Sequence, residues 1–213
     1  MRYKAILFDM DGTLLDTLTD MADAVNHILS VHGWSLRTIE EVRAFVGNGA
    51  RRLMERAVPP EVTGGDFETV LTEYRDWYQA HNCVATAPYP GIPALLAALA
   101  KAGIKTAVVS NKPDATTKTL AARFFPGLPA FGQRDDVPPK PAPDLVFRAL
   151  ETLGVDAADA IYVGDSEVDV ATARNAGLPL AAVSWGFRGR RALAEAGAAV
   201  IVDTAAELLE VLR

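Results

Sequence analysis

The sequence predicts an α/β protein: a mainly parallel, doubly wound sheet of the Rossmann-like kind, into which an all-helical segment is inserted. Three observations support this fold class. Short apolar runs of strand length recur along the chain, helical patterns separate most of them, and one long stretch shows helical patterns alone. Strands that are apolar on both faces and alternate with helices are typical of a parallel sheet covered on both sides. Such sheets bind ligands at the carboxyl ends of their strands.

Five apolar runs are expected to form strands, because each has strand length and permits burial on both faces. They are Tyr3–Phe8, Ile104–Val109, Ala160–Val163, Leu180–Val183 and Ala199–Val202. Five helical patterns accompany them, and a glycine follows three of these at the position of a left-handed C-cap. The expected helices are Ile92–Ala102, Asp114–Phe125, Pro143–Leu153, Val168–Ala176 and Ala205–Leu212.

Residues 16–84 break this alternation, because they contain no strand pattern. Apolar residues recur there at helical spacing, beginning with Leu18 and Met21. Thr38 and Glu41 have the spacing of a capping box, which marks the start of a helix. This stretch is therefore predicted to be entirely helical.

A proline-rich segment, residues 85–93, leads back from the helical stretch and suits a stiff connector. The predicted organisation is an α/β core of residues 1–15 and 85–213 and a helical cap domain of residues 16–84. Because the cap follows the first strand directly, we expect it to lie over the carboxyl end of that strand.

The composition limits the partners of the chain. Its 213 residues carry 21 Lys and Arg against 27 Asp and Glu, a formal net charge of −6, and no basic stripe argues for nucleic acid. Cys83 is the only cysteine, so no internal disulfide forms, which is typical of a reducing compartment. No apolar stretch has the length of a signal-peptide core or a membrane span. We expect a cytoplasmic protein that acts on a small molecule without nucleic acid or membrane, as a monomer or homodimer.

Two aspartates follow the first strand, in the stretch FDMDGTLLD. Residues two apart in extended chain point the same way, so Asp9 and Asp11 both face the crevice if the chain stays extended; Gly12 then permits a sharp turn. Two close carboxylates in a partly desolvated place are unfavourable unless a cation lies between them. The alternative is that both are solvated turn residues.

A second acidic pair favours the cation. The stretch IYVGDSEVD again ends an apolar strand in an aspartate, Asp165, and Asp169 follows four residues later on the same helical face. Oxygen ligands of this kind suit Mg²⁺. Zinc is disfavoured, because the three histidines are scattered through the helical stretch at His27, His32 and His81.

Two further segments supply donors for an anion beside such a metal. Ser110 and Asn111 follow the strand that ends at Val109, and Lys140 lies between prolines in VPPKPAPD. Each alone is commonly a turn former or a solvated side chain. Together with the carboxylates they predict a site for a metal ion and a phosphate.

These motifs, DMDGT at residues 9–13, Ser110, Lys140 and GDSEVD at residues 164–169, occur in the order and spacing found in the haloacid dehalogenase superfamily. Over essentially its whole length the chain resembles a phosphatase of that superfamily with a helical cap, and phosphoglycolate phosphatase is the nearest type. The resemblance implies hydrolysis of a small phosphorylated metabolite, with 2-phosphoglycolate as one candidate.

The resemblance also implies roles for individual residues. Asp9 attacks phosphorus to form an aspartyl-phosphate, and Asp11 acts as general acid and then as general base. Mg²⁺ is held by Asp9, the Asp11 backbone carbonyl and Asp165, with Asp169 as a further ligand or a support. The phosphoryl oxygens are held by further groups of the same motifs: Gly12, Thr13, Ser110, Asn111 and Lys140.

Substrate choice is expected to lie in the cap. The stretch VGNGARRL contains Gly47, Asn48, Arg51 and Arg52, whose glycines permit close approach and whose arginines suit a substrate carboxylate. A helix start with solvated arginines is the equally weighted alternative. The rival functions are a sugar phosphomutase, a phospho-aspartate receiver, a non-catalytic sensor of phosphate esters and a hydrolytic dehalogenase.

Overall fold

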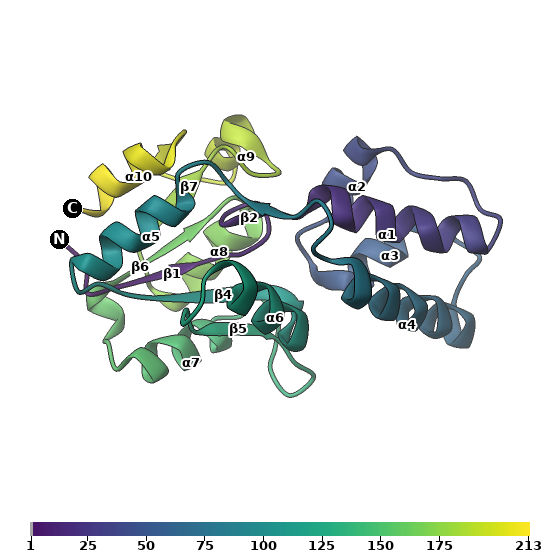
Figure 1. Ribbon diagram of the computed structural model, residues 1–213, viewed down its shortest axis with the longest axis horizontal. Coiled ribbons are helices and arrows are strands. Elements are labelled where there is room, and N and C mark those ends of the chain that lie inside the picture. The colour runs from purple at the N-terminus through teal and green to yellow at the C-terminus, as the bar shows by residue number, and fades with distance from the viewer. Residues whose placement is uncertain (1) are drawn as a thin grey trace.

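The computed structural model describes residues 2–213 and contains the predicted parallel sheet (Figure 1). Its six strands lie in the order β5-β4-β1-β6-β7-β8, and every neighbouring pair is parallel. The strands are β1 (Ala5–Phe8), β4 (Lys105–Pro113), β5 (Ala130–Gln133), β6 (Ala160–Gly164), β7 (Leu180–Val183) and β8 (Ile201–Val202). The predicted α/β class is thus confirmed.

Side-chain alternation along the strands explains why both faces of the sheet are covered. Ile6 and Phe8 point into one hydrophobic cluster, and Ala5 and Leu7 point into the other. The first cluster is closed by α5 (Ile92–Lys101), α6 (Asp114–Phe124) and α10 (Ala205–Leu212). The second is closed by α7 (Asp144–Leu153) and α8 (Glu167–Ala176). Runs that are apolar at every position are the sequence signature of this double burial.

Two elements of the core depart from the sequence-based expectation. The edge strand β5 has only two apolar residues, so no apolar run announced it, and its Gly132 packs against the backbone of Asp114. The short helix α9 (Gly189–Glu195) buries Leu193 alone, too little for a periodic pattern. The other predicted elements are present with end points that differ by a few residues.

The segment between β1 and α5 folds into four helices with a hydrophobic cluster of their own. They are α1 (Leu18–Val31), α2 (Ile39–Phe45), α3 (Gly49–Ala57) and α4 (Gly64–His81). The predicted capping box starts α2, where Thr38 and Glu41 exchange backbone-to-side-chain hydrogen bonds. Figure 1 shows these helices beside the carboxyl end of the sheet. We call them the helical cap, and the limits of the cap as a domain stay a prediction.

Two connectors join the helical cap to the core, and they run side by side. β2 (Leu15–Asp16) and β3 (Ala87–Pro88) form a short antiparallel pair, which sequence inspection missed because each strand has only two residues. Asp20, in the first turn of α1, accepts backbone hydrogen bonds from Val84, Ala85 and Thr86 at 3.0, 2.8 and 2.9 Å. This buried carboxylate therefore fixes the returning chain to the start of the cap.

Among residues 2–213, no helix combines the length and the apolar character that crossing a bilayer requires.

The contacts of Asp20 predict a large cost for its removal. Asp20→Ala leaves three backbone N–H groups without their acceptor, and we expect it to lower the free energy of unfolding by about 2–4 kcal/mol. Urea denaturation measures this change. The matched control is Asp23→Ala on the exposed face of α1, which should change stability by less than about 0.5 kcal/mol. Equal effects of the two substitutions would contradict the assigned role.

Candidate active site

The sheet order brings the predicted strand-end residues together. β1 lies between β4 and β6, and Phe8 is level with Val108 and Val163. Asp9 follows β1, Ser110 lies near the end of β4, and Asp165 follows β6, so all three meet at one edge of the sheet. Parallel neighbouring strands place residues at equivalent positions close together, which is why the sequence pattern predicted this arrangement.

Three buried carboxylates form an acidic cluster at this edge. Asp9, Asp165 and Asp169 each present an oxygen, and these oxygens lie within 4.8 Å of one another. Burial is the largest cause that raises the pKa of Asp9, to about 7, against the opposing charge of Lys140. Burial likewise raises the pKa of Asp165 well above its usual range, helped by the charges of Asp169 and Asp9. Ionising all three therefore requires positive charge nearby.

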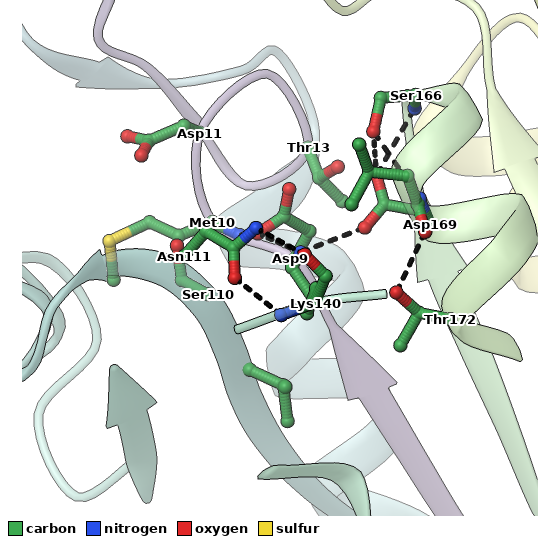
Figure 2. A network of polar contacts seen from close by, with 12 residues as sticks. Asp9, Met10, Asp11, Thr13, Ser110, Asn111, Lys140, Ser166, Asp169 and Thr172 are labelled. Carbon is green, nitrogen blue, oxygen red and sulfur yellow. Dashed lines mark hydrogen bonds and ion pairs between the residues drawn. The ribbon is translucent and has the colours of Figure 1, made fainter. Parts of the chain in front are cut away.

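Lys140 supplies one such charge from inside the cluster. Its Nζ lies 2.9 Å from Asp9 Oδ1, 2.8 Å from Asp169 Oδ1 and 3.1 Å from the Tyr162 hydroxyl (Figure 2). Although burial opposes it, the charges of Asp169 and Asp9 hold the pKa of Lys140 well above its usual value. The side chain is thus a buried ammonium directed at Asp9.

Asp169 is fixed by its own helix and by this lysine. Its Oδ2 accepts hydrogen bonds from the backbone N and hydroxyl of Ser166, which form a capping box at the start of α8. Its Oδ1 accepts from Lys140 Nζ. Gly164 permits this approach, since a Cβ there would overlap the Asp169 side chain. Asp169 thereby holds Lys140 in position as well as adding charge to the cluster.

The backbone of Lys140 is held by Asn111. Asn111 Oδ1 accepts from the Lys140 N–H at 2.7 Å, and Asn111 Nδ2 donates to the Lys140 carbonyl at 3.0 Å. The amide predicted to hold phosphate is therefore occupied by protein backbone. The side chain of Asn111 thus positions Lys140, and a contact of Asn111 with phosphate stays a prediction.

The loop after β1 packs on Asp165. The Thr13 hydroxyl donates to Asp165 Oδ1 at 3.2 Å, and the backbone N–H of Phe187 donates to Oδ2 at 2.7 Å. Gly12 adopts φ 82°, and a Cβ there would overlap the Asp165 carboxylate, as it would at Gly186. Gly12 and Thr13 thus shape the acidic cluster, and the Thr13 hydroxyl is engaged with Asp165 rather than directed at a phosphate.

Asp11 lies apart from the acidic cluster, because the chain leaves the extended conformation after Asp9. Figure 2 shows its carboxylate turned away from Asp9 and Asp169. Asp11 Oδ1 accepts from the Thr17 hydroxyl at 2.7 Å and lies 3.1 Å from Lys112 Nζ. The resemblance assigns the Asp11 backbone carbonyl, not its side chain, to the metal, and the position of this carboxylate separates it from the other three.

Lys112 is a functional candidate that sequence reasoning missed. Its Nζ donates to the hydroxyl of Tyr78 on α4 at 2.8 Å, and its side chain is 3% exposed. The signal was available: Ser110 and Lys112 are two apart in β4, so both face the same side of the strand. No sequence pattern indicated the hydrogen bond between Lys112 and Tyr78, because it depends on how the helical cap packs on the core.

A cavity of about 350 Å³ lies between the helical cap and the strand ends. From the core it is lined by Asp9, Asp11, Ser110, Lys112, Lys140 and Asp165. Its cap side is formed largely by apolar and tyrosine side chains of α1, α3 and α4. The predicted catalytic residues therefore line one cavity.

The predicted cap residues are only partly at this cavity. Gly47 lines it, and its carbonyl lies 3.4 Å from Asn111 Nδ2. Asn48 is the N-cap residue of α3 and does not line the cavity. Arg51 pairs with Glu68 at 2.7 Å and Arg52 with Glu55 at 2.6 Å, both at the surface. These arginines were expected to meet a substrate carboxylate, and neither of them lines the cavity.

Arg188 reaches the cavity wall instead, from the loop before α9. It donates to the carbonyls of Arg43 and Val46 at the end of α2, and its Nε lies 3.0 Å from Glu167 Oε2. The residue joins core and helical cap. No sequence pattern marks such a contact, because its partners are remote in the chain.

The family model for haloacid dehalogenase-like hydrolases matches residues 6–183. The chain belongs to this family. The expectation drawn from the four motifs is confirmed, together with the fold and the phosphoric monoester hydrolase class.

Individual relatives cover the chain almost completely. N-acetylmuramic acid 6-phosphate phosphatase of Pseudomonas aeruginosa is 36% identical over 221 residues, covering 100% of this chain and 96% of the relative. Phosphoglycolate phosphatase of Pseudomonas savastanoi pv. phaseolicola is 34% identical over 217 residues, covering 97% and 78%. The crystal structure of a protein described as a phosphoglycolate phosphatase, from Lactobacillus delbrueckii subsp. bulgaricus, matches with a TM-score of 0.94 and 37% identity. The match covers 100% of this chain and 99% of the other.

The raised pKa values predict how stability of the metal-free protein depends on pH. The pKa of Asp9 in the folded protein is about 7, above its ordinary 3.8. Its favourable contribution to the free energy of unfolding is therefore complete below about pH 4 and is lost as the pH rises through 7. Asp165 acts in the same direction. We expect the melting temperature in EDTA to fall by roughly 2–8 °C between about pH 5 and pH 8.

Magnesium should reverse much of this fall, since binding to the ionised cluster stabilises the folded state. The control is Asp9→Asn, whose amide does not titrate and should show a smaller fall. Melting curves in EDTA and in Mg²⁺ measure both effects. A metal-free melting temperature that rises from pH 5 to pH 8 would contradict the prediction.

Proposed function

We propose that this protein is a magnesium-dependent phosphatase that hydrolyses a small phosphorylated metabolite through an aspartyl-phosphate on Asp9. The main support is the position of Asp9, which faces the cavity while Lys140 Nζ lies 2.9 Å from its Oδ1. The lysine neutralises one carboxylate oxygen and leaves the other available as a nucleophile. Lys140 also offers positive charge to the phosphoryl group during transfer.

The donor set fits a hard divalent cation. Asp9 and Asp165 offer carboxylate oxygens from a buried site, and their raised pKa values mean that the ionised forms lack compensating charge. Mg²⁺ suits such oxygen ligands, and the Asp11 backbone carbonyl would be a third ligand. Asp169, already bonded to Ser166 and Lys140, would support these ligands. When bound, the ion would supply positive charge to the phosphoryl oxygens.

Asp11 is the proposed general acid and base. It would protonate the departing alkoxide as Asp9 attacks phosphorus, and it would then take a proton from the water that cleaves the aspartyl-phosphate. Its position suits this work, since its carboxylate faces the cavity and is held by Thr17 and Lys112. The Ser110 hydroxyl, also at the cavity, would bind a phosphoryl oxygen.

The helical cap would close the site over the substrate. Two contacts already link it to the core around the cavity: Tyr78 with Lys112, and Arg188 with the end of α2. A closed site excludes water and strengthens the interactions of Lys140 with the phosphoryl group. The names of the relatives support two substrate candidates, 2-phosphoglycolate and a sugar 6-phosphate.

Replacement of the nucleophile tests the proposal directly. Asp9→Asn should lower release of inorganic phosphate from p-nitrophenyl phosphate by at least about 10⁴-fold, because the amide cannot attack phosphorus. EDTA should have a comparable effect that Mg²⁺ reverses. The exposed Asp23→Asn serves as control and should retain full activity. An active Asp9→Asn enzyme would refute the mechanism. If the unmodified enzyme transferred the phosphoryl group to a sugar without releasing phosphate, it would be a mutase.

The contacts of Lys112 predict a dependence on the leaving group. Lys112→Met removes the ammonium that holds Asp11, so kcat/KM should fall about 10–100-fold for an alkyl phosphate, whose alkoxide requires protonation. The fall should be much smaller for p-nitrophenyl phosphate, because nitrophenolate leaves without a proton. Lys112→Arg should restore part of the loss.

The control for Lys112 is Lys118→Met, which removes an exposed lysine of α6. It should leave kcat/KM unchanged for both the alkyl phosphate and p-nitrophenyl phosphate. An equal loss for both leaving groups in Lys112→Met would show that Lys112 does not act through Asp11.

A further inference from the structure

The cavity above Asp9 is larger and more apolar than the glycolate part of 2-phosphoglycolate requires. Its volume of about 350 Å³ falls in the range of pockets that hold drug-sized ligands. On the cap side its wall includes Met21, Val46, Ala50 and Leu53. Apolar walls of this extent gain free energy when apolar surface of a ligand is removed from water.

Charge is the second constraint on the ligand. Four basic side chains line the cavity, and three of them are already engaged. Lys140 is paired with Asp9 and Asp169, Lys112 with Asp11, and Arg188 with Glu167 and two carbonyls. The fourth, Arg75, is an exposed residue of α4. Of the four, Arg75 alone has no ion pair among the described residues. A carboxylate one carbon from the ester oxygen would therefore compete with Asp9, Asp11 or Glu167 for the three engaged cations, which is costly.

A buried hydroxyl is the third observation. Tyr74 is 2% exposed and lines the cavity, and its hydroxyl has no hydrogen bond to any described residue. In residues 2–213, Thr86 Oγ1 is the only fully buried side-chain polar atom without a hydrogen-bond partner. The unpartnered Tyr74 hydroxyl is therefore not fully buried and is accessible from the cavity. The ring of Tyr74 stacks on that of Tyr78 at 5.8 Å with an interplanar angle of 3°. The pair offers one open polar group beside a flat apolar surface.

We propose that the leaving alcohol of the substrate is uncharged near the ester, larger than glycolate, and amphipathic. Its apolar face contacts Leu53 and the neighbouring cap residues, and one of its hydroxyl or amide groups hydrogen-bonds to Tyr74. This assignment rests on the proposed phosphatase function and selects among its substrates. It favours a phosphorylated sugar-like alcohol over 2-phosphoglycolate.

The experiment compares matched esters with the unmodified enzyme and Mg²⁺, and it measures kcat/KM from phosphate release. The first pair is 2-phosphoglycolate and its neutral carboxamide, which differ in one charge. The second pair is ethyl and hexyl phosphate, which differ in apolar length. We expect the carboxamide to exceed the acid by at least about tenfold, and hexyl to exceed ethyl phosphate by about tenfold or more.

Variants locate the two contacts. Leu53→Ala should reduce the preference for hexyl over ethyl phosphate several-fold, while leaving ethyl phosphate nearly unaffected. Tyr74→Phe should lower kcat/KM about 5–20-fold for a hexose 6-phosphate and leave hexyl phosphate unchanged. The matched control is Thr72→Ala on the exposed side of α4, which should preserve all the ratios. Melting curves establish that each variant is folded.

The outcomes separate this inference from the function on which it rests. If 2-phosphoglycolate is hydrolysed as well as its carboxamide, or if hexyl phosphate shows no advantage, the assigned substrate class is wrong and the phosphatase stands. If no ester releases phosphate, p-nitrophenyl phosphate included, the proposed function itself fails. Because both pairs are measured on the natural chain, a poorly folded variant does not affect either comparison.

Discussion

The burial of several carboxylates around one lysine is the constraint on which the site depends. Asp9, Asp165 and Asp169 lie within a few ångströms of one another and away from water, and Lys140 is the single ammonium among them. Such a cluster is tolerable only if further positive charge enters it or some of its carboxyls stay protonated. The surrounding structure follows from this demand. Glycines allow the close approaches, the start of α8 donates hydrogen bonds to Asp169, and Asn111 fixes the backbone of Lys140.

The position of Asp11 complements this cluster. Its carboxylate is turned toward the helical cap, where it contacts Thr17 and Lys112, so two neighbouring aspartates of one loop have different surroundings. The proposed nucleophile thus lies among the buried carboxylates beside Lys140, and the proposed acid and base lies apart from them at the cavity. One residue of separation and one turn at Gly12 suffice to give the two side chains these different positions.

The sequence predicted those parts of the molecule that depend on local pattern. Apolar runs located five of the six strands of the large sheet, and the aspartates at two of their ends located the acidic cluster. The sequence pattern did not predict contacts between segments that are remote in the chain. Asp20, Tyr78 and Arg188 each owe their importance to partners many residues away. Arg51 and Arg52 show the converse: Ala50 and Leu53 on the same helix face the cavity, so helical geometry directs both arginines outward.

The paired connectors have a consequence for how the two parts of the molecule relate. The chain enters and leaves the helical bundle at neighbouring points, as β2 and β3, and Asp20 ties the exit to the first turn of α1. The two covalent connections of the bundle to the core therefore lie side by side, at one place. The bundle's length, sequence and lining can change without altering the path of the sheet. In the proposed function, chemistry and substrate choice thus belong to separate stretches of one polypeptide.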